Sequence, residues 1–130
     1  YQPDAFYEIA DELGLMVWQE FIFACALYPR HAAFLASVEA EVRQQAARLA
    51  HHACIVIWGG NNENEAALEW YEPSRVQRDL FVADYLKLYV ETVLPAVRAV
   101  DAVLGLPTFV LCFFCVLEFF YFFLIFFVLF

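Results

Sequence analysis

Two short apolar runs, each lying between segments of helical character, constrain the fold of this chain most. They occupy residues 15–18 (LMVW) and 54–58 (CIVIW). Both runs are continuous rather than alternating, which is typical of strands buried on both faces of a parallel sheet. They predict two buried strands that lie side by side in parallel.

Helical patterns flank and separate these runs. A first helix is predicted from residue 3 to 13, and Gly14 suits the left-handed residue that follows a helix. Further helices are predicted at residues 34–49 and 63–71, and a last one at 80–103, where Pro95 either kinks the helix or starts a new one. The alternation of strands and helices indicates an α/β fold with a parallel sheet.

Ligands of parallel sheets bind at the carboxyl ends of the strands, so we look for chemistry just after Trp18 and Trp58. The turn at residues 59–65 carries two carboxylates, Glu63 and Glu65, and three amides. A carboxyl desolvated against an aromatic wall is suited to general acid catalysis. A polar turn with an N-capping Asn and an acidic first helical turn also explains the same residues. From the residues alone, both interpretations stay open.

Three stretches of the chain resemble one enzyme family. Residues 52–63, HACIVIWGGNNE, resemble the acid/base motif of glycoside hydrolase family 2. Residues 10–21, ADELGLMVWQEF, and 23–29, FACALYP, are similar to the β-mannosidases of that family. The resemblance extends from residue 1 to about 101, with a departure around residues 68–71 where the helix after the motif looks shorter.

This resemblance implies a fold, a reaction and a set of site residues. Residues 1–105 are expected to be a fragment of a (β/α)8 TIM barrel with about two to three βα units. The reaction is removal of terminal, non-reducing β-D-mannose from glycans by a retaining mechanism. Glu63 inherits the acid/base role and Asn62 the contact with the sugar 2-hydroxyl, while Trp18 and Gln19 line the pocket and Trp70 is an aromatic platform. The last three also fit core aromatics or a loop amide.

The second carboxylate of a retaining glycosidase, the nucleophile, is not among the expected site residues. In this family it comes from a later barrel strand, and neither Glu20 nor Glu65 is expected to replace it. A complete barrel needs eight strands and about 250 residues, whereas this chain has 130. The chain alone is therefore expected to be inactive. The resemblance to the animal enzymes implies a lysosomal location and a β-mannoside oligosaccharide substrate, with no cofactor.

Metal and thiol chemistry are not expected. His31, His51 and His52 with Cys54 match no zinc spacing, and the adjacent histidines would diverge in a strand. Cys25 and Cys54 lie in apolar runs and are expected to be buried free thiols. The remaining cysteines, Cys112 and Cys115, have CxxC spacing in a wholly apolar run without a redox context.

The segment at residues 106–130 differs from the rest of the chain. Of its 25 residues 22 are apolar, and it holds 10 of the 15 Phe. It is expected to be a helical tail, which is either translated read-through or mis-spliced sequence, or a membrane segment interrupted by Glu118. In the second case the chain is a truncated, non-catalytic product anchored in a membrane. The net charge of −9 argues against a nucleic-acid partner.

Overall fold

A sheet of three parallel strands is the centre of the fold, in the order β1–β2–β3. The computed structural model describes residues 1–101 together with 109–110. The elements are α1 (Asp4–Leu13), β1 (Val17–Glu20), α2 (Ala32–Leu49), β2 (Ile55–Gly59), η1 (Ala66–Glu69), α3 (Glu72–Val76), α4 (Arg78–Tyr85), η2 (Leu86–Val93), α5 (Leu94–Arg98) and β3 (Phe109–Val110). The predicted α/β class and the parallel pairing of the first two strands are confirmed.

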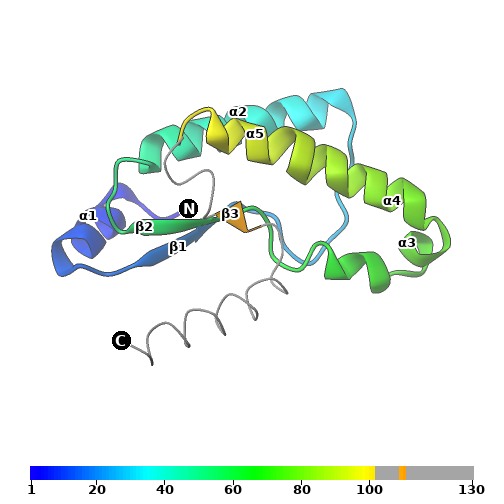
Figure 1. The fold of residues 1–130 in the computed structure, drawn as a ribbon, viewed down its shortest axis with the longest axis horizontal. Helices are drawn as coiled ribbons and strands as arrows, with labels where there is room; N and C mark the ends of the chain where they lie inside the picture. The colour runs from blue at the N-terminus through cyan, green and yellow to red at the C-terminus, as the bar shows by residue number, and fades with distance from the viewer. Residues whose placement is uncertain (102–108, 111–130) are drawn as a thin grey trace, which may run out of the picture.

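The helices gather on one side of the sheet. Figure 1 shows α2 and the continuous rod from α4 to α5 running side by side above the strands, and α2 packs against η2 and α5. The core between these layers holds buried side chains from β2, α2, η2 and α5, namely Ile55, Trp58, Val42, Ala46, Leu49, Leu88, Val93, Ala96 and Val97. Burial of this apolar stripe is the main force that holds the helices on the sheet.

The first helix matches the prediction at both ends. It spans Asp4–Leu13 and ends at Gly14, whose φ of 66° lies in the left-handed region that glycine adopts without strain. Two residues, Leu15 and Met16, then complete the turn before β1 begins at Val17. The predicted strand at 15–18 is therefore shifted by two residues, and Leu15 and Met16 are 54% and 77% exposed rather than buried. A continuous apolar run does not mark where its strand begins.

The other helix boundaries also differ from the prediction. α2 begins at Ala32 because the His31 side chain accepts a hydrogen bond from the Phe34 amide at 3.2 Å and caps the helix. The predicted helix at 63–71 is instead the short η1, and α3 follows it with Pro73 in its first turn. Both changes come from local capping and proline geometry that the apolar pattern does not report.

The last helical rod contains a π-helical segment in its middle. η2 precedes α5, which starts at Leu94 with Pro95 in its first turn, where its missing N–H is tolerated. The Thr92 hydroxyl donates to the Lys87 carbonyl at 2.8 Å, five residues back. Pro95 thus lies in the first turn of the α5 segment, which continues the rod without a break after the π-helical turn.

β3 is the part of the predicted tail that the structure describes. Its two residues pair in parallel with Trp58 and Gly59 of β2, so residues 109–110 form a strand where the sequence predicted a helix. The free edge of β2 has unpaired backbone groups, and a strand satisfies them. The remainder of the predicted tail lies outside the described residues. Within residues 1–101 and 109–110, no helix has the length and apolar character needed to cross a membrane.

Candidate functional site

The loops that follow β1 and β2 are joined to each other at the carboxyl ends of the strands. Ala24 and Asn62 form an isolated parallel bridge. In it the Asn62 amide donates to the Phe23 carbonyl at 2.9 Å, and the Cys25 amide donates to the Asn62 carbonyl at 2.8 Å. The bridge extends the β1–β2 pairing beyond the strands and fixes the turn that carries Glu63.

Glu63 and Asn62 lie together in this turn, directly after the carboxyl end of β2. Both are half-buried, and Glu63 has a φ of 59°, a left-handed conformation that costs energy for a residue with a side chain. Glu63 Oε2 lies 3.4 Å from Cys25 Sγ, and Asn62 Nδ2 lies 3.5 Å from the same sulfur. The structure therefore brings the predicted acid/base residue and its predicted amide neighbour to one point.

Cys25 is the residue at this site that the sequence analysis missed. It was expected to be a buried thiol, but it is exposed and has a φ of 50°. Partial desolvation in the loop raises the pKa of its thiol, and the Glu63 carboxylate raises it further. A single cysteine in an apolar run gives no signal of such a role. Only the convergence of loops after neighbouring parallel strands could have indicated it.

Trp18 lies on the opposite face of β1 from Gln19 and beside Gly59 of β2. A Cβ atom at Gly59 would stand 2.7 Å from Trp18 Nε1 and 2.7 Å from Glu20 Cγ, so both side chains lie close over this glycine. The Trp18 Nε1 donor is buried and has no hydrogen-bond partner among the described residues. Burial raises the pKa of the Glu20 carboxyl. The face with Trp18 and Glu20 thus carries a donor and an acid near the end of β1.

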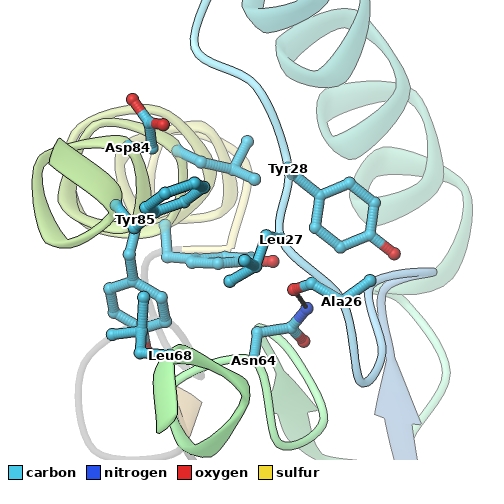
Figure 2. Close-up of a pocket in the computed structure, with 10 residues that line it drawn as sticks. Ala26, Leu27, Tyr28, Asn64, Leu68, Asp84 and Tyr85 are labelled. Carbon is cyan, nitrogen blue, oxygen red and sulfur yellow. Dashed lines mark hydrogen bonds between the residues drawn. The ribbon is translucent and has the colours of Figure 1, made fainter. Parts of the chain in front are cut away.

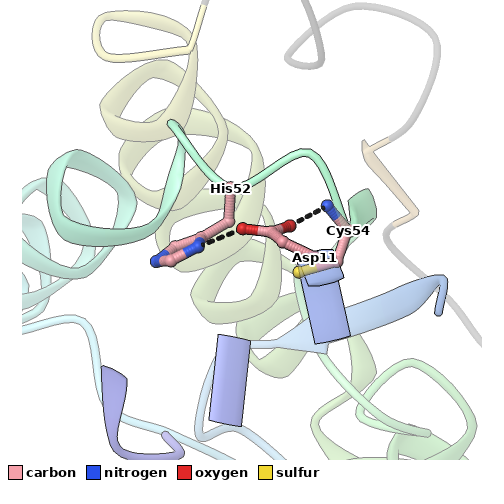
Figure 3. Close-up of side chains that lie close together, drawn as sticks. All are labelled: Asp11, His52 and Cys54. Carbon is pink, nitrogen blue, oxygen red and sulfur yellow. Dashed lines mark hydrogen bonds and ion pairs between the residues drawn. The ribbon is translucent and has the colours of Figure 1, made fainter. Parts of the chain in front are cut away.

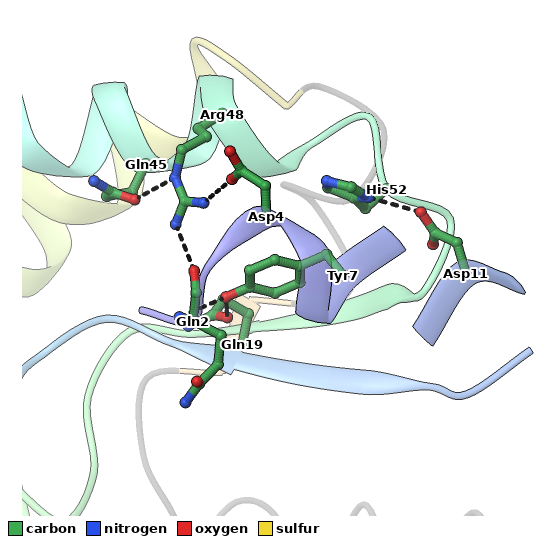
Figure 4. A network of polar contacts seen from close by, with 8 residues as sticks. All are labelled: Gln2, Asp4, Tyr7, Asp11, Gln19, Gln45, Arg48 and His52. Carbon is green, nitrogen blue, oxygen red and sulfur yellow. Dashed lines mark hydrogen bonds and ion pairs between the residues drawn. The ribbon is translucent and has the colours of Figure 1, made fainter. Parts of the chain in front are cut away.

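Gln19 is directed away from Glu63. Its Oε1 accepts a hydrogen bond from the Tyr7 hydroxyl at 2.5 Å, and its Nε2 donates to the Glu20 carbonyl at 2.7 Å. Figure 4 shows this amide within the network that joins α1 to the sheet and to Arg48 of α2. The structure does not bring Gln19 together with Asn62 and Glu63, because successive residues of a strand face opposite sides.

Trp70 stands at the end of η1, and its side chain is 45% exposed. Its neighbour Tyr71 donates a hydrogen bond from its hydroxyl to the Cys25 carbonyl at 2.9 Å. This bond ties the segment with Trp70 to the loop that contacts Glu63. The structure thus places Trp70 next to a residue that contacts the loop bearing Cys25.

A small pocket beside the site is lined mainly by apolar groups. Figure 2 shows it between the loop at Ala26–Tyr28, Asn64 and the rod of α4 and η2. Asn64 Nδ2 donates to the Ala26 carbonyl at 2.8 Å, and Arg30 forms a salt bridge of 2.9 Å with Asp84 of α4. These contacts hold both loops against the helices, which gives the turn at Glu63 a rigid support.

A second polar cluster lies at the opposite, amino end of β2. Asp11, His52 and Cys54 place their potential metal ligands within 4.8 Å of one another (Figure 3). Each group is already engaged: Asp11 accepts from the Cys54 amide at 2.6 Å and lies 2.7 Å from His52 Nδ1, and the Cys54 thiol donates to the Tyr7 carbonyl. The His52 contact lowers the pKa of Asp11, and burial raises that of Cys54 to about 11. These contacts join α1 to the segment before β2. A thiol held protonated is a poor metal ligand.

The two adjacent histidines do not diverge as predicted. His51 and His52 lie in the turn before β2 rather than in the strand, and their ring centroids are 4.2 Å apart. Alternation of side chains applies only within an extended strand, and β2 begins three residues later, at Ile55. The prediction for this pair was therefore wrong.

The relatives found by sequence and by structure agree with each other. No protein-family model matches the chain. The chain is 50% identical over 95 residues to a beta-mannosidase of Bos taurus and 48% identical over 103 residues to one of Mus musculus. These matches cover 72% and 78% of this chain but only 11% and 12% of the relatives.

A solved structure matches as well. The beta-D-mannosidase of Dictyoglomus thermophilum superposes with a TM-score of 0.57 at 38% identity, covering 76% of this chain and 12% of that one. The chain thus spans about a tenth of the length of the relatives that it matches, and it includes the turn with Asn62 and Glu63. By sequence and by fold, this chain corresponds to a segment of the beta-mannosidases.

Proposed function

We propose that this chain is part of a glycoside hydrolase that removes terminal, non-reducing β-D-mannose residues from glycans with retention of configuration. The observation that carries the proposal is the place of Glu63, which follows the carboxyl end of a parallel strand in a turn braced by the neighbouring loop. Similarity to a segment of the beta-mannosidases supports the substrate class. The lysosome is the proposed location, by similarity to mammalian relatives.

In this proposal, residues 1–105 are a segment of a (β/α)8 barrel. Within these residues the two parallel strands β1 and β2, with their helices on one side, are what a segment of such a barrel has. The face of the sheet on which Trp18 and Glu20 lie over Gly59 would then face the barrel interior. Residues 106–130, of which 109–110 form β3, are proposed to be either read-through sequence or a membrane segment.

Glu63 supplies the proton in the proposed mechanism. As general acid it protonates the leaving glycosidic oxygen while a carboxylate nucleophile from a later barrel strand attacks the anomeric carbon. It then removes a proton from the water that hydrolyses the glycosyl-enzyme. Asn62 donates to the sugar 2-hydroxyl, and its place beside Glu63 suits that role.

Three residues have supporting roles in the proposal. Trp18 lies on the proposed interior face with an N–H donor that has no partner among the described residues, and Trp70 has an exposed ring that a sugar can stack on. Gln19 acts indirectly, because its amide is held by Tyr7. We therefore expect Gln19 to shape the pocket through the backbone of Glu20 rather than to contact sugar.

A hybrid enzyme tests this function. The matched 95 residues of the bovine beta-mannosidase are replaced by the corresponding residues of this chain, so that the rest of the barrel is supplied. We expect the hybrid to hydrolyse aryl β-mannosides and to leave aryl β-glucosides largely intact. A correctly folded hybrid without β-mannoside hydrolysis would contradict the proposal.

A further inference from the structure

The thiol of Cys25 contacts both side chains of the proposed acid/base pair. Its Sγ donates toward Glu63 Oε2 at 3.4 Å and accepts from Asn62 Nδ2 at 3.5 Å. A cysteine thiol has one weak donor and weak acceptor capacity, so both of these contacts fit its chemistry. The residue comes from the loop after β1, whereas its two partners come from the turn after β2.

Asn62 and Glu63 are neighbours in the chain, and adjacent residues of an extended backbone direct their side chains apart. Two features make these side chains converge. Glu63 takes a left-handed conformation, with φ at 59°, which turns its carboxylate. Cys25, which itself has a φ of 50°, contacts both the Glu63 carboxylate and the Asn62 amide with its one sulfur atom.

The backbone of Cys25 is held by hydrogen bonds at both its amide and its carbonyl group. Its amide donates to the Asn62 carbonyl at 2.8 Å, and its carbonyl accepts from the Tyr71 hydroxyl at 2.9 Å. The sulfur is therefore held at a set position relative to the turn. A group with a fixed backbone can orient its partners, whereas a mobile one cannot.

We propose that Cys25 is a positioning residue, which uses its thiol to hold the Glu63 carboxylate and the Asn62 amide in the arrangement that the reaction needs. The inference rests on the proposed function of Glu63 and adds a residue to it. Cys25 itself touches no substrate in this scheme. Its effect on the reaction passes through Glu63.

The two partners have opposite electrostatic effects on the thiol. The Glu63 carboxylate raises the pKa of Cys25, and the Asn62 amide lowers it, because one disfavours and the other stabilises the thiolate. Since only the thiolate is alkylated at an appreciable rate, the reactivity of Cys25 reports both contacts.

The experiment measures the rate at which iodoacetamide alkylates Cys25 at pH 8. Mass spectrometry of peptides separates the Cys25 rate from the rates of the other cysteines. We expect Glu63→Gln to accelerate the reaction at least about twofold and Asn62→Ala to slow it, because the thiolate fraction sets the rate. Glu65→Gln is the matched control, since Glu65 is exposed on the same turn. Protection of the buried Cys54 shows that the fold is kept in each sample.

The alkylation is measured on the 130-residue chain and on the hybrid enzyme, and rates are compared only in samples whose Cys54 stays protected. Equal Cys25 rates in Glu63→Gln and in the parent would overturn the proposal, as would an equal effect of Glu65→Gln. This readout needs no catalysis, so it stands even if the hybrid proves inactive and the proposed function fails.

A second arm in the hybrid separates positioning from mere structure. Cys25→Ala removes the hydrogen-bonding group, and Cys25→Ser keeps a donor and acceptor at the same left-handed position. We expect Cys25→Ala to lower kcat for mannosides with poor leaving groups about tenfold more than for activated aryl mannosides, and Cys25→Ser to restore most of that difference. Equal loss on both substrates, without rescue by Ser, would show a structural role only.

Discussion

Glu63 combines a strained backbone with a carboxylate at the end of a parallel strand, and its chemistry can be tested by one substitution. Glu63→Gln keeps size and polarity but removes the transferable proton. In the hybrid enzyme we expect about 10²- to 10⁴-fold loss of kcat on disaccharide substrates, whose leaving group needs protonation, and a far smaller loss on activated aryl mannosides. Steady-state kinetics on both substrates decide the matter. Equal losses would argue against an acid role, and Glu65→Gln should behave like the parent.

Gly59 is needed where two side chains of β1 cross over β2. A methyl group at this position would lie 2.7 Å from both Glu20 Cγ and Trp18 Nε1, and 3.5 Å from the Glu20 backbone. We expect Gly59→Ala to lower the free energy of unfolding by about 1–3 kcal/mol through overpacking. Urea unfolding of the hybrid measures it. Adding Glu20→Ala removes one of the two close contacts and should restore part of the loss. No change in Gly59→Ala would show that the two side chains lie elsewhere.

The contacts of Asp11 with His52 and Cys54 predict a pH dependence of stability. The hydrogen bond with His52 lowers the pKa of Asp11 from its ordinary 3.8, so the folded state binds this proton less tightly than the unfolded state. The contribution is fully present above about pH 4 and is lost as the pH falls through the lower, folded pKa. We therefore expect Asp11→Asn to reduce the urea midpoint at pH 7, with a difference from the parent that shrinks below pH 4. Glu12→Gln, on the exposed side of α1, should show no such trend.

At the scale of elements, the bridge between the two loops makes a prediction for hydrogen exchange. The amides of Phe21, Cys25 and Asn62 donate to backbone carbonyls across the β1–β2 junction. We expect these three to exchange at least tenfold more slowly than the amide of Ile22, whose side chain is 60% exposed in the same loop. Exchange measured by NMR or mass spectrometry tests this. Equal rates for Asn62 and Ile22 would mean that the bridge does not form.

The elements that the sequence predicted well are those with a local physical marker. Gly14 supplies the left-handed end of α1, and the apolar stripe of α2 gives its buried face. The strand and helix boundaries that the sequence predicted badly have no such marker. Nothing in the run at residues 15–18 shows that Leu15 and Met16 still belong to the turn. The π-helical turn before Pro95 likewise depends on backbone bonding that no residue type announces.

The candidate site divides in the same way. The turn with Asn62 and Glu63 could be predicted because it follows an apolar strand and carries a recognisable motif. The orientation of Gln19 could not, because it depends on a two-residue shift of β1 and on Tyr7 of α1. Cys25 could not be predicted as a partner of Glu63, since the loop that presents it has no regular pattern and the contact spans 38 residues of sequence.

At the scale of the whole molecule, the two interpretations of residues 106–130, a membrane segment or read-through sequence, make different predictions for the 130-residue chain. If residues 106–130 act as a membrane segment, the expressed chain remains in the membrane fraction after a carbonate wash and leaves it when these residues are deleted. If they are read-through sequence, deletion changes solubility but leaves no membrane-dependent pool. We expect the second outcome, because Glu118 interrupts the apolar run and no cluster of Lys and Arg directly precedes it in the sequence.

The last prediction is that the chain as it stands neither hydrolyses mannosides nor persists in solution as a monomer. Large apolar side chains are already exposed on the described part, with Leu13, Met16 and Ile22 at 67%, 77% and 60%. β1 lies at an end of the strand order, so its outer edge has no partner strand among the described residues. Such an edge together with apolar patches favours association of copies.

Catalysis fails for a separate reason, because the proposed acid/base residue lacks the nucleophile that would form the covalent intermediate. The purified chain is assayed with an aryl β-mannoside while its size is measured by light scattering. A monodisperse monomer would contradict the first half of the prediction. Turnover that disappears in Glu63→Gln would contradict the second half, since it would mean that another carboxylate of this chain, such as Glu20 beside Trp18, acts as the nucleophile.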